Sequence, residues 1–540
     1  MQELRYALKA AAKNLFNTDI EPEVTRPDER FGDYSTNIAL KLALSVGKNP
    51  REIAQQLADD LKNLSILEKV EVAGPGFLNL RLTDEAVGSE IRSVNENYGQ
   101  NQHYAGQTVV LEHTDPNPFK EFHIGHAYSN TVGTAIGKLM ANSGAEVRQV
   151  SYHGDVGLHI AMAIFGLKNS ENQDGLGMSY AAGAGAYKDD PQAKKEIDRI
   201  NELVYSQDDP EINRLYEEGR KRSLEAFNKI YERLEVTFEK QYFESEVAIE
   251  GIQIVRENIG KVFQESDGAI IYDGEKVGLH KRVFITSQGL PTYEAKEIGL
   301  AFAKERDYPN ASSFIVITAN EIDDYFRVLV AAIKEINGEL ATKIRHISHG
   351  VVKLASGKMS SRTGQVVTLT DLQTDIEQKI RELYGGDKAS PDIVFGALKY
   401  EYLKHRVGGD FIFDIDESIS LQGNSGPYLQ YAYARARSII QKAGDAGQGS
   451  EFKNFEPAER SLARKISEYP EAVHKATAEL MPHHVATYLY ELAQAFNRFY
   501  EHNQVIGDPR ARMRLSLVRA YSQVLKNGLG LLNIAAPERM

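Results

Sequence analysis

The chain has 540 residues, contains no cysteine and carries a formal net charge of −13. The lack of cysteine excludes a disulfide scaffold, a cysteine-ligated zinc site, an iron–sulfur cluster and a thiol nucleophile, and it fits a reducing compartment. A composition of 42% hydrophobic and 26% charged residues is ordinary for a globular protein, and the length predicts roughly three or four domains. No apolar run approaches the roughly 18 residues of a membrane span. We therefore expect a cytoplasmic protein that makes no membrane contact.

The first 105 residues have the pattern of a small α/β module. Leu4, Leu8, Ala11 and Leu15 recur at helical spacing with charges between them, which predicts an amphipathic helix over 2–17 and lacks the apolar block of a signal peptide. A second helix is predicted over 50–64. Two strands should follow, at 70–72 and, after a glycine-marked turn, within 74–82.

Between residues 106 and 391, strands alternate with helices, which predicts a Rossmann-like parallel sheet. A long helix should begin near residue 124 and end before 142. A polar, helical insertion is expected at about 168–265, and its glycine-rich segment near 175–190 is predicted to be a mobile loop. The strands expected in this sheet are 108–113, 146–152, 283–286 and 313–318, with a last edge at 351–354.

From about residue 392 to 540 the pattern is almost purely helical, after a helix at 371–384. Residues 395–540 carry 18 basic and 16 acidic side chains, so their net charge is +2 against −15 for the first 394 residues. A basic cluster is opposed in sequence only by Asp508. Taken singly it could be a solvated helix face, but beside the motifs below an RNA-facing surface is the better interpretation. The cluster comprises Arg510, Arg512, Arg514, Arg519 and Lys526.

The segment PNPFKEFHIGH (116–126) places two imidazoles one turn apart where a strand ends and a helix begins. The N–H groups and dipole of a helix N-terminus attract anions there. Gly125 lets a ring or phosphate approach the backbone closely, while His123 and His126 can donate hydrogen bonds to phosphoryl oxygens. Two alternatives stay open at this point: a pair of core histidines, or a zinc site completed by His153 or His159.

A second motif, SGKMSSRTG (356–364), is a small, polar, glycine-bounded loop that carries Lys358 and Arg362. Such a loop suits closure over a polyphosphate, although a solvated basic loop is the plain alternative. It is not a Walker loop, because position 352 is Val where glycine is required and position 359 is Met where Ser or Thr is required.

Together, HIGH after the first strand and KMSSR at the far end of the same sheet resemble the class I aminoacyl-tRNA synthetases. Within that class the chain resembles the arginyl-tRNA synthetases over nearly its full length. The resemblance implies a multidomain α/β protein with an N-terminal tRNA-binding module (1–105), a Rossmann-like catalytic domain (106–391) and an all-α anticodon-binding domain (392–540). The segments that carry it are 31–43, 74–82, 110–126, 152–159, 223–238 and 420–440.

The resemblance implies a ligase that forms arginyl-adenylate from L-arginine and ATP and then transfers the arginyl group to tRNA(Arg). It implies that His123, His126 and Lys358 are catalytic, stabilising charge on the phosphates. Mg²⁺ would be carried with ATP, so no protein metal cage is expected. A monomer is the family default, and arginine activation is expected to wait for bound tRNA. ATP contacts are expected from Lys120, Gly125, Met359, Ser360 and Arg362.

By motif position, Glu112 and Asn117 should contact the amino-acid portion of the substrate, together with His153. Tyr293 and Glu297, from LPTYEAKEIGL, should meet the guanidinium. Their spacing puts both on one helix face, where the plain alternative is two exposed polar residues.

The chain departs from the family pattern in three places. The family usually has Asp where Glu297 stands, which adds a methylene to the acceptor. It often has Gln where Ile322 aligns, with Asn320, Glu321 and Asp323 as nearby substitutes for ribose contacts. Glu121 replaces a proline that commonly precedes the HIGH block.

For tRNA, aromatic stacking and phosphate contacts would suit Tyr431, Tyr433, Arg435 and Arg437 at a helix start, although the tyrosines could equally be packing residues. Arg512 and Arg519 are further candidates from the basic cluster. Three other functions are alternatives: a class I synthetase for another amino acid, a catalytically silent tRNA-binding paralogue, and a small nucleotidyltransferase. The paralogue would be expected to lose the histidines or Lys358, and the nucleotidyltransferase would not need a large helical domain.

Overall fold

The computed structural model describes residues 2–169, 175–355, 367–444 and 451–540. At one end lies a small module whose antiparallel sheet has the strand order β1-β2-β4-β3. Helices α1 and α3 confirm the two predicted helices; Leu4, Leu8 and Ala11 are buried, whereas Leu15, in the last turn of α1, is 42% exposed. The elements are α1 (Gln2–Phe16), β1 (Val24–Thr25), β2 (Tyr34–Thr36), α2 (Ile38–Val46), α3 (Pro50–Leu61), β3 (Leu67–Ala73) and β4 (Phe77–Leu82).

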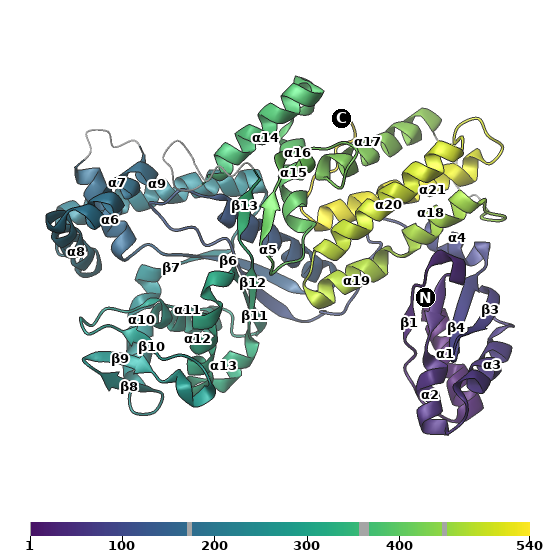
Figure 1. Cartoon of the computed structure of the whole chain (residues 1–540), viewed down its shortest axis with the longest axis horizontal. Coiled ribbons are helices and arrows are strands. Elements are labelled where there is room, and N and C mark those ends of the chain that lie inside the picture. The colour runs from purple at the N-terminus through teal and green to yellow at the C-terminus, as the bar shows by residue number, and fades with distance from the viewer. Residues whose placement is uncertain (1, 170–174, 356–366, 445–450) are drawn as a thin grey trace.

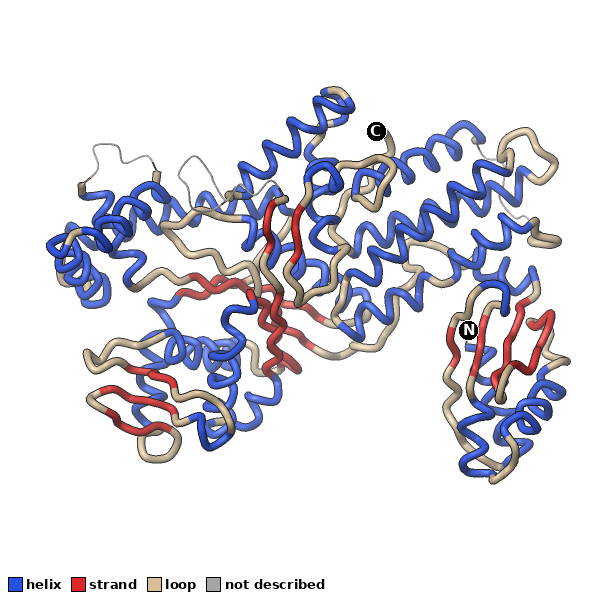
Figure 2. The backbone as a smooth tube through the Cα atoms, in the orientation of Figure 1, coloured by secondary structure: helices blue, strands red, loops and turns tan. Residues whose placement is uncertain are grey.

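A five-stranded parallel sheet with the order β12-β11-β5-β6-β7 forms the centre of the molecule (Figure 2). The predicted Rossmann-like sheet is therefore confirmed, with β5, β6 and β11 where strands were expected. Helix α5 (Ile124–Asn142), buried along most of its length, packs between this sheet and the C-terminal helices. The strands are β5 (Thr108–Glu112), β6 (Glu146–His153), β7 (Lys240–Phe243), β11 (Ala311–Ala319) and β12 (Ile344–His349).

Two predicted strands belong to other sheets. Strand β10 (Arg282–Ile285) pairs antiparallel with β9 (Ala269–Tyr272), which pairs with β8 (Phe263–Ser266) in a separate three-stranded sheet. Strand β13 (Val352–Leu354) pairs with β14 (Phe411–Phe413), and the outer strand of the main sheet is β12. An apolar extended run predicts a strand but does not identify its hydrogen-bond partner, so both assignments were wrong.

The predicted insertion is not purely helical, because it contributes β7, the other outer strand of the main sheet. The mobile loop expected near 175–190 is also wrong: Leu176–Asp189 is helix α7. The glycines serve close packing, since a Cβ on Gly183 would lie 1.9 Å from the carbonyl oxygen of Met162. The helices of this region are α6 (Leu158–Lys168), α7, α8 (Pro191–Ser206), α9 (Pro210–Leu234) and α10 (Glu244–Glu257).

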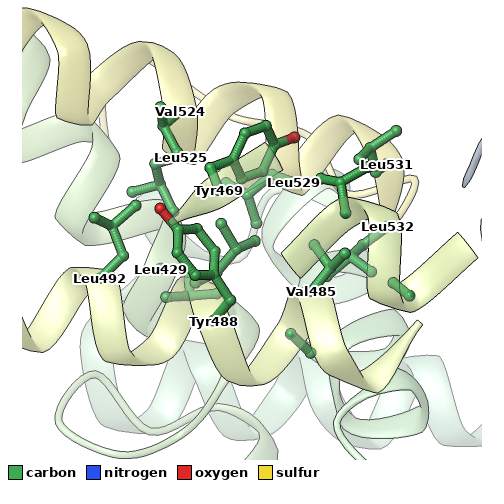
Figure 3. Close-up of a cluster of buried hydrophobic side chains, with 14 of the residues drawn as sticks. Leu429, Tyr469, Val485, Tyr488, Leu492, Val524, Leu525, Leu529, Leu531 and Leu532 are labelled. Atoms are coloured by element: carbon green, nitrogen blue, oxygen red, sulfur yellow. The ribbon is translucent and has the colours of Figure 1, made fainter. Parts of the chain in front are cut away.

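Residues 392–540 form the predicted, almost purely helical region. Leucine, valine and tyrosine side chains from several helices meet in one buried cluster (Figure 3). No helix in the described part of the chain is long and apolar enough to cross a bilayer. The helices are α11 (Tyr293–Asp307), α12 (Asp323–Ile336), α13 (Gly338–Lys343), α14 (Leu369–Tyr384), α15 (Pro391–Leu403), α16 (Ile415–Ser418), α17 (Gly426–Ala443), α18 (Pro457–Ser467), α19 (Tyr469–Glu479), α20 (His483–His502) and α21 (Ala511–Leu531).

The N-terminal module docks on the C-terminal helices, near α18, through its helix α4 (Asp84–Arg92) (Figure 1). Arg460 on α18 forms a buried ion pair with Asp33 at 2.6 Å and also donates to the carbonyl of Leu82. A second pair joins Arg26 to Glu471 at 3.1 Å. Segments more than 400 residues apart in the sequence are therefore held together by charge-assisted hydrogen bonds.

Candidate active site

The turn that leads from β5 into α5 has an unusual backbone. Three residues other than glycine have positive φ angles within six positions: Thr114 (83°), Asp115 (42°) and Phe119 (65°). Asp115 fastens the turn to the neighbouring strand, because its Oδ1 accepts a hydrogen bond of 2.8 Å from the backbone N–H of Tyr152. Such conformations cost free energy and are concentrated at functional sites.

His123 and His126 lie at the first turn of α5 with their rings stacked, 3.6 Å between centroids. The Nδ1 of His123 accepts from the N–H of Gly125 (3.1 Å), and the Nδ1 of His126 accepts from the N–H of His123 (3.3 Å). Burial lowers the pKa of His123 to about 4, with Lys120 adding to the effect, and burial lowers the pKa of His126 still more strongly. Both rings are therefore neutral, and each carries its proton on Nε2.

The structure places the segment that follows the second motif beside the first motif. The N–H of Ile124 donates to the carbonyl of Val367 at 3.1 Å, and the N–H of Leu369 donates to the carbonyl of Phe122 at 3.0 Å. The segment 367–369, which follows the second motif in the sequence, is therefore tied to residues 122–124 of the first motif by backbone hydrogen bonds. Lys358, Met359, Ser360 and Arg362 themselves lie outside the described residues.

Four carboxylates gather at the carboxyl ends of β5 and β6, and two of them are already neutralised. Glu112 pairs with Lys304 at 2.5 Å, and Glu244 pairs with Lys296 at 2.5 Å, all four side chains being almost completely buried. Burial, together with the nearby Glu112 carboxylate, raises the pKa of the Glu297 carboxyl to about 8. The fourth carboxyl, Asp115, also has a pKa well above its ordinary range because of burial.

Of the proposed guanidinium pair, Glu297 is half-buried whereas Tyr293 is 60% exposed. The ammonium of Lys296 lies 4.6 Å from the centre of the Tyr293 ring. The plain alternative of two exposed polar residues therefore fits Tyr293 but not Glu297. A half-buried carboxyl with a raised pKa is a site that a cation would stabilise.

Asn117 and His153 are each held by a hydrogen bond between the turn after β5 and the end of β6. The Oδ1 of Asn117 accepts from the N–H of Gly154 at 3.1 Å, and a Cβ on Gly154 would come within 2.5 Å of that oxygen. The buried His153 ring donates from Nδ1 to the carbonyl of Pro116 (2.7 Å), and its Nε2 has no partner among the described residues. Lys120 lies 5.1 Å from the ring of Tyr180 on α7, and burial lowers its pKa.

The zinc alternative is not supported. The Nδ1 atoms of His123 and His126 are engaged as described, His153 bonds Pro116, and the Nε2 of His159 is 2.9 Å from the carbonyl of Gly154. Among the described residues no group of three or more potential ligands could hold a metal ion.

The departures from the family pattern have local explanations. Ile322 packs against an apolar cluster, while Asp323 accepts from the hydroxyl of Ser348 at 3.2 Å. Glu121 lies against the start of α7, where its carboxylate oxygen would be 2.4 Å from a Cβ on Gly177. The space left by that glycine admits the longer side chain.

Sequence reasoning missed Lys296, Lys304 and Glu244. Lys304 stands seven residues after Glu297 and so shares its helix face, a spacing that could have indicated it. No sequence pattern indicated that Glu244 belongs to the site, because its partner Lys296 lies 52 residues away in the chain.

The RNA candidates in the helical domain differ in how exposed their side chains are and in whether they already have a partner. Tyr431 is 41% exposed, Arg512 is exposed, and Arg435 stacks on Tyr500 at 4.3 Å. Arg519 donates to the carbonyl of Gly444. Tyr433 is buried, as its packing alternative expected.

The basic cluster, however, is smaller than the sequence suggested. Arg510 and Arg514 are both bonded to Glu459, whose side chain is fully buried. Arg514 also pairs with Glu456 at 2.8 Å. The prediction that only Asp508 opposes the cluster is therefore wrong, because the opposing charges come from another helix.

Three family models match the chain, and they agree with this architecture. The model of the class I (R) tRNA synthetase catalytic domain matches residues 89–415, the arginyl-tRNA synthetase N-terminal domain matches 2–82, and the DALR anticodon-binding domain matches 429–540. With HIGH at the start of α5 on a parallel sheet, the chain is a class I aminoacyl-tRNA synthetase.

Named relatives define the specificity. The chain is 31% identical to an arginine–tRNA ligase of Lactobacillus delbrueckii subsp. bulgaricus, over 99% of this chain and 98% of the other, and 30% identical to that of Fusobacterium nucleatum, over 100% and 99%. The structure of Thermus thermophilus arginyl-tRNA synthetase matches with a TM-score of 0.82 at 26% identity, covering all of both chains. The chain belongs to the arginyl-tRNA synthetases, the ligases that charge tRNA with arginine.

Proposed function

We propose that arginyl-adenylate forms at the edge of the sheet where β5 enters α5. The observation that supports this most is the pair of backbone hydrogen bonds that join residues 122–124 to residues 367–369. They hold the segment that follows the second motif beside the first motif, which supports a single site built from both. We assign catalysis to His123, His126 and Lys358, and ATP contacts to Lys120, Gly125, Met359, Ser360 and Arg362.

The tautomers of the two histidines suit this role. Because both Nδ1 atoms accept backbone N–H groups, both Nε2–H groups remain as donors. They act together with the positive end of α5 on the charge that develops at the α-phosphate. Neutral rings donate hydrogen bonds without needing to bind a proton first. Mg²⁺ would be held by the phosphates of ATP and would neutralise part of their charge.

For the amino acid, Glu297 and Tyr293 receive the guanidinium, while Glu112, Asn117 and His153 position the amino-acid portion. Glu112 and Glu244 are each neutralised by a buried lysine, which leaves Glu297 as the acceptor for a substrate cation. A planar guanidinium can meet a carboxylate through two parallel hydrogen bonds.

For tRNA(Arg), we assign contacts to Tyr431, Arg435, Arg512 and Arg519. The division into residues 1–105, 106–391 and 392–540 gives the tRNA-binding, catalytic and anticodon-binding domains. We further infer a cytoplasmic monomer, on the basis of the cysteine-free composition and the family default.

The test is ATP–pyrophosphate exchange with arginine, with and without tRNA(Arg). We expect His126→Ala to lower kcat by about 10²- to 10³-fold with little change in the KM for arginine, because a transition-state donor is lost. His502→Ala, at an exposed position on α20, is the matched control. Wild-type kcat in His126→Ala would contradict the catalytic assignment.

The same assay tests the coupling to tRNA and the alternative functions. Exchange is expected only when tRNA is present, and full exchange without it would refute the coupling. No exchange in either condition would favour the silent paralogue.

A further inference from the structure

A small basic cavity lies between α17 and α21, away from the adenylate site. Its volume is about 230 Å³, and three cations line it: Arg437, Arg519 and Lys526. Among the described residues, Glu538 is the acidic residue that lines this cavity. We call this feature the α17–α21 pocket. Its excess of positive charge suits an anion.

Glu538 is bonded to one of these cations. Its carboxylate lies 2.9 Å from the Nη2 of Arg437. The Nε of Arg437 is buried and has no hydrogen-bond partner among the described residues. A guanidinium can donate from Nε–H and Nη2–H to two oxygens of one anion. At Arg437 only the Nη2 donor of this pair is bonded to Glu538.

The segment that carries Glu538 is anchored on both sides. The amide of Gln430 on α17 donates to the carbonyl of Ala535 at 2.9 Å, and Asn533 donates to the carbonyl of Leu234 at 2.9 Å. Met540 packs against the apolar core. The carboxylate is therefore presented to Arg437 by a fixed backbone beside α17 (Figure 1).

The ion pair itself is weak. The side chains of Arg437 and Glu538 are 37% and 64% exposed. Exposed pairs of this kind contribute little, because water screens them and two long side chains must be ordered. A backbone phosphate carries one negative charge, as the carboxylate does, but a phosphate that accepts from both Nε–H and Nη2–H would use both donors and so compete for the same guanidinium.

We propose that Glu538 holds the place of an RNA phosphate on Arg437, and that a tRNA backbone phosphate displaces it when tRNA binds. The inference rests on the proposed function, in which this domain contacts tRNA(Arg). Glu538 thus lowers the affinity of the α17–α21 pocket for RNA until a well-placed phosphate arrives, which disfavours weak, non-specific complexes.

The test measures the Kd of a tRNA(Arg) transcript by fluorescence anisotropy at several salt concentrations. Glu538→Gln should bind about two- to fivefold more tightly than wild type, because it removes one competing charge. The slope of log Kd against log salt should become steeper by about one phosphate contact. Arg437→Gln should weaken binding and lower that slope.

Glu218→Gln is the matched control, because Glu218 forms a similarly exposed pair with Arg214 on α9 and its loss changes the net charge equally. It should leave Kd and slope unchanged. The double variant Arg437→Gln/Glu538→Gln should bind like Arg437→Gln if Glu538 acts through Arg437.

Unchanged or weaker binding by Glu538→Gln, with normal charging by wild type, overturns this inference alone. Equal tightening by Glu218→Gln overturns it too, since net charge would then explain the effect. Tighter RNA binding by Glu538→Gln in a protein whose wild type charges no tRNA would support the pocket and contradict the proposed function.

Discussion

The carboxyl groups near α11 show how burial and neighbours give similar residues different states. Glu112 and Glu244 each form an ion pair of 2.5 Å with a buried lysine. Glu297 has no such partner among the described ion pairs, and burial together with Glu112 raises its pKa to about 8. Without substrate, Glu297 therefore lacks a cationic partner, and the arginine guanidinium can supply it.

The raised pKa of Glu297 predicts how arginine binding depends on pH. Below pH 8 the carboxyl is mainly protonated and accepts the guanidinium poorly, so the KM for arginine should fall by up to about tenfold for each unit from pH 6 towards 8 and then level off. Glu297→Gln should raise that KM by roughly 10- to 100-fold and remove the pH dependence. The KM for ATP serves as the internal reference. A KM for arginine that is flat over this range in wild type would show that Glu297 does not hold the guanidinium.

Among the elements, α7 is the clearest case of a local sequence pattern that misleads. GLGMSYAAGAGAY has the composition of a flexible loop, yet it forms a helix packed against α6. Gly166 and Gly183 let the two backbones approach, since a Cβ on either would lie within 2.0 Å of a carbonyl oxygen of the other helix. Helix α7 also carries Tyr180, which covers Lys120 beside the HIGH motif.

Substitution of these glycines should separate close packing from helix propensity. Gly183→Ala forces a methyl group against the backbone of Met162 and should destabilise the protein by about 1–3 kcal/mol. Gly185→Ala, with nothing within 4 Å of its Cβ, should be neutral or stabilising by up to about 1 kcal/mol. Chemical denaturation and hydrogen exchange of α6 and α7 measure both. Equal effects of the two substitutions would mean that the α6–α7 contact is not tight.

For the whole molecule, docking of the N-terminal module depends on a few charged contacts. Arg460 is 7% exposed and bonds both Asp33 and the carbonyl of Leu82. Asp33 in turn accepts from the backbone N–H of Leu82 at 2.7 Å. The same carboxylate thus holds the end of strand β4 and fastens the module to α18.

Removal of Arg460 should loosen the module. Arg460→Met leaves the buried Asp33 with only the more distant Arg464, 3.9 Å away, as its cation, at a cost of up to about 3–5 kcal/mol. Limited proteolysis should then release the module, and tRNA affinity should fall. Arg30→Met, which breaks an exposed pair with Asp28, should cost less than about 1 kcal/mol. Adding Asp33→Asn to Arg460→Met should recover part of the loss, and an additive double variant would show that the pair is not coupled.

The sequence by itself determined the class of fold, the helical domain and the two signature motifs. These features are local: apolar periodicity depends on neighbours within a few residues, and HIGH and KMSSR are contiguous. The resemblance that they carry also indicated arginine specificity, which the relatives confirm.

Only the tertiary structure decided which strands share a sheet, which basic residues are neutralised by acidic partners, and which lysines form ion pairs with the carboxylates of the site. Strand β10 leaves the main sheet, Arg514 is paired with Glu459, and Lys296 is paired with Glu244, all through partners distant in the chain. Charge and strand patterns in the sequence indicate which kinds of interaction a residue can form. Its actual partner depends on which distant segment the fold places beside it. The physical reason is that ion pairs and sheet hydrogen bonds act over a few ångströms in space, and sequence separation does not encode that distance.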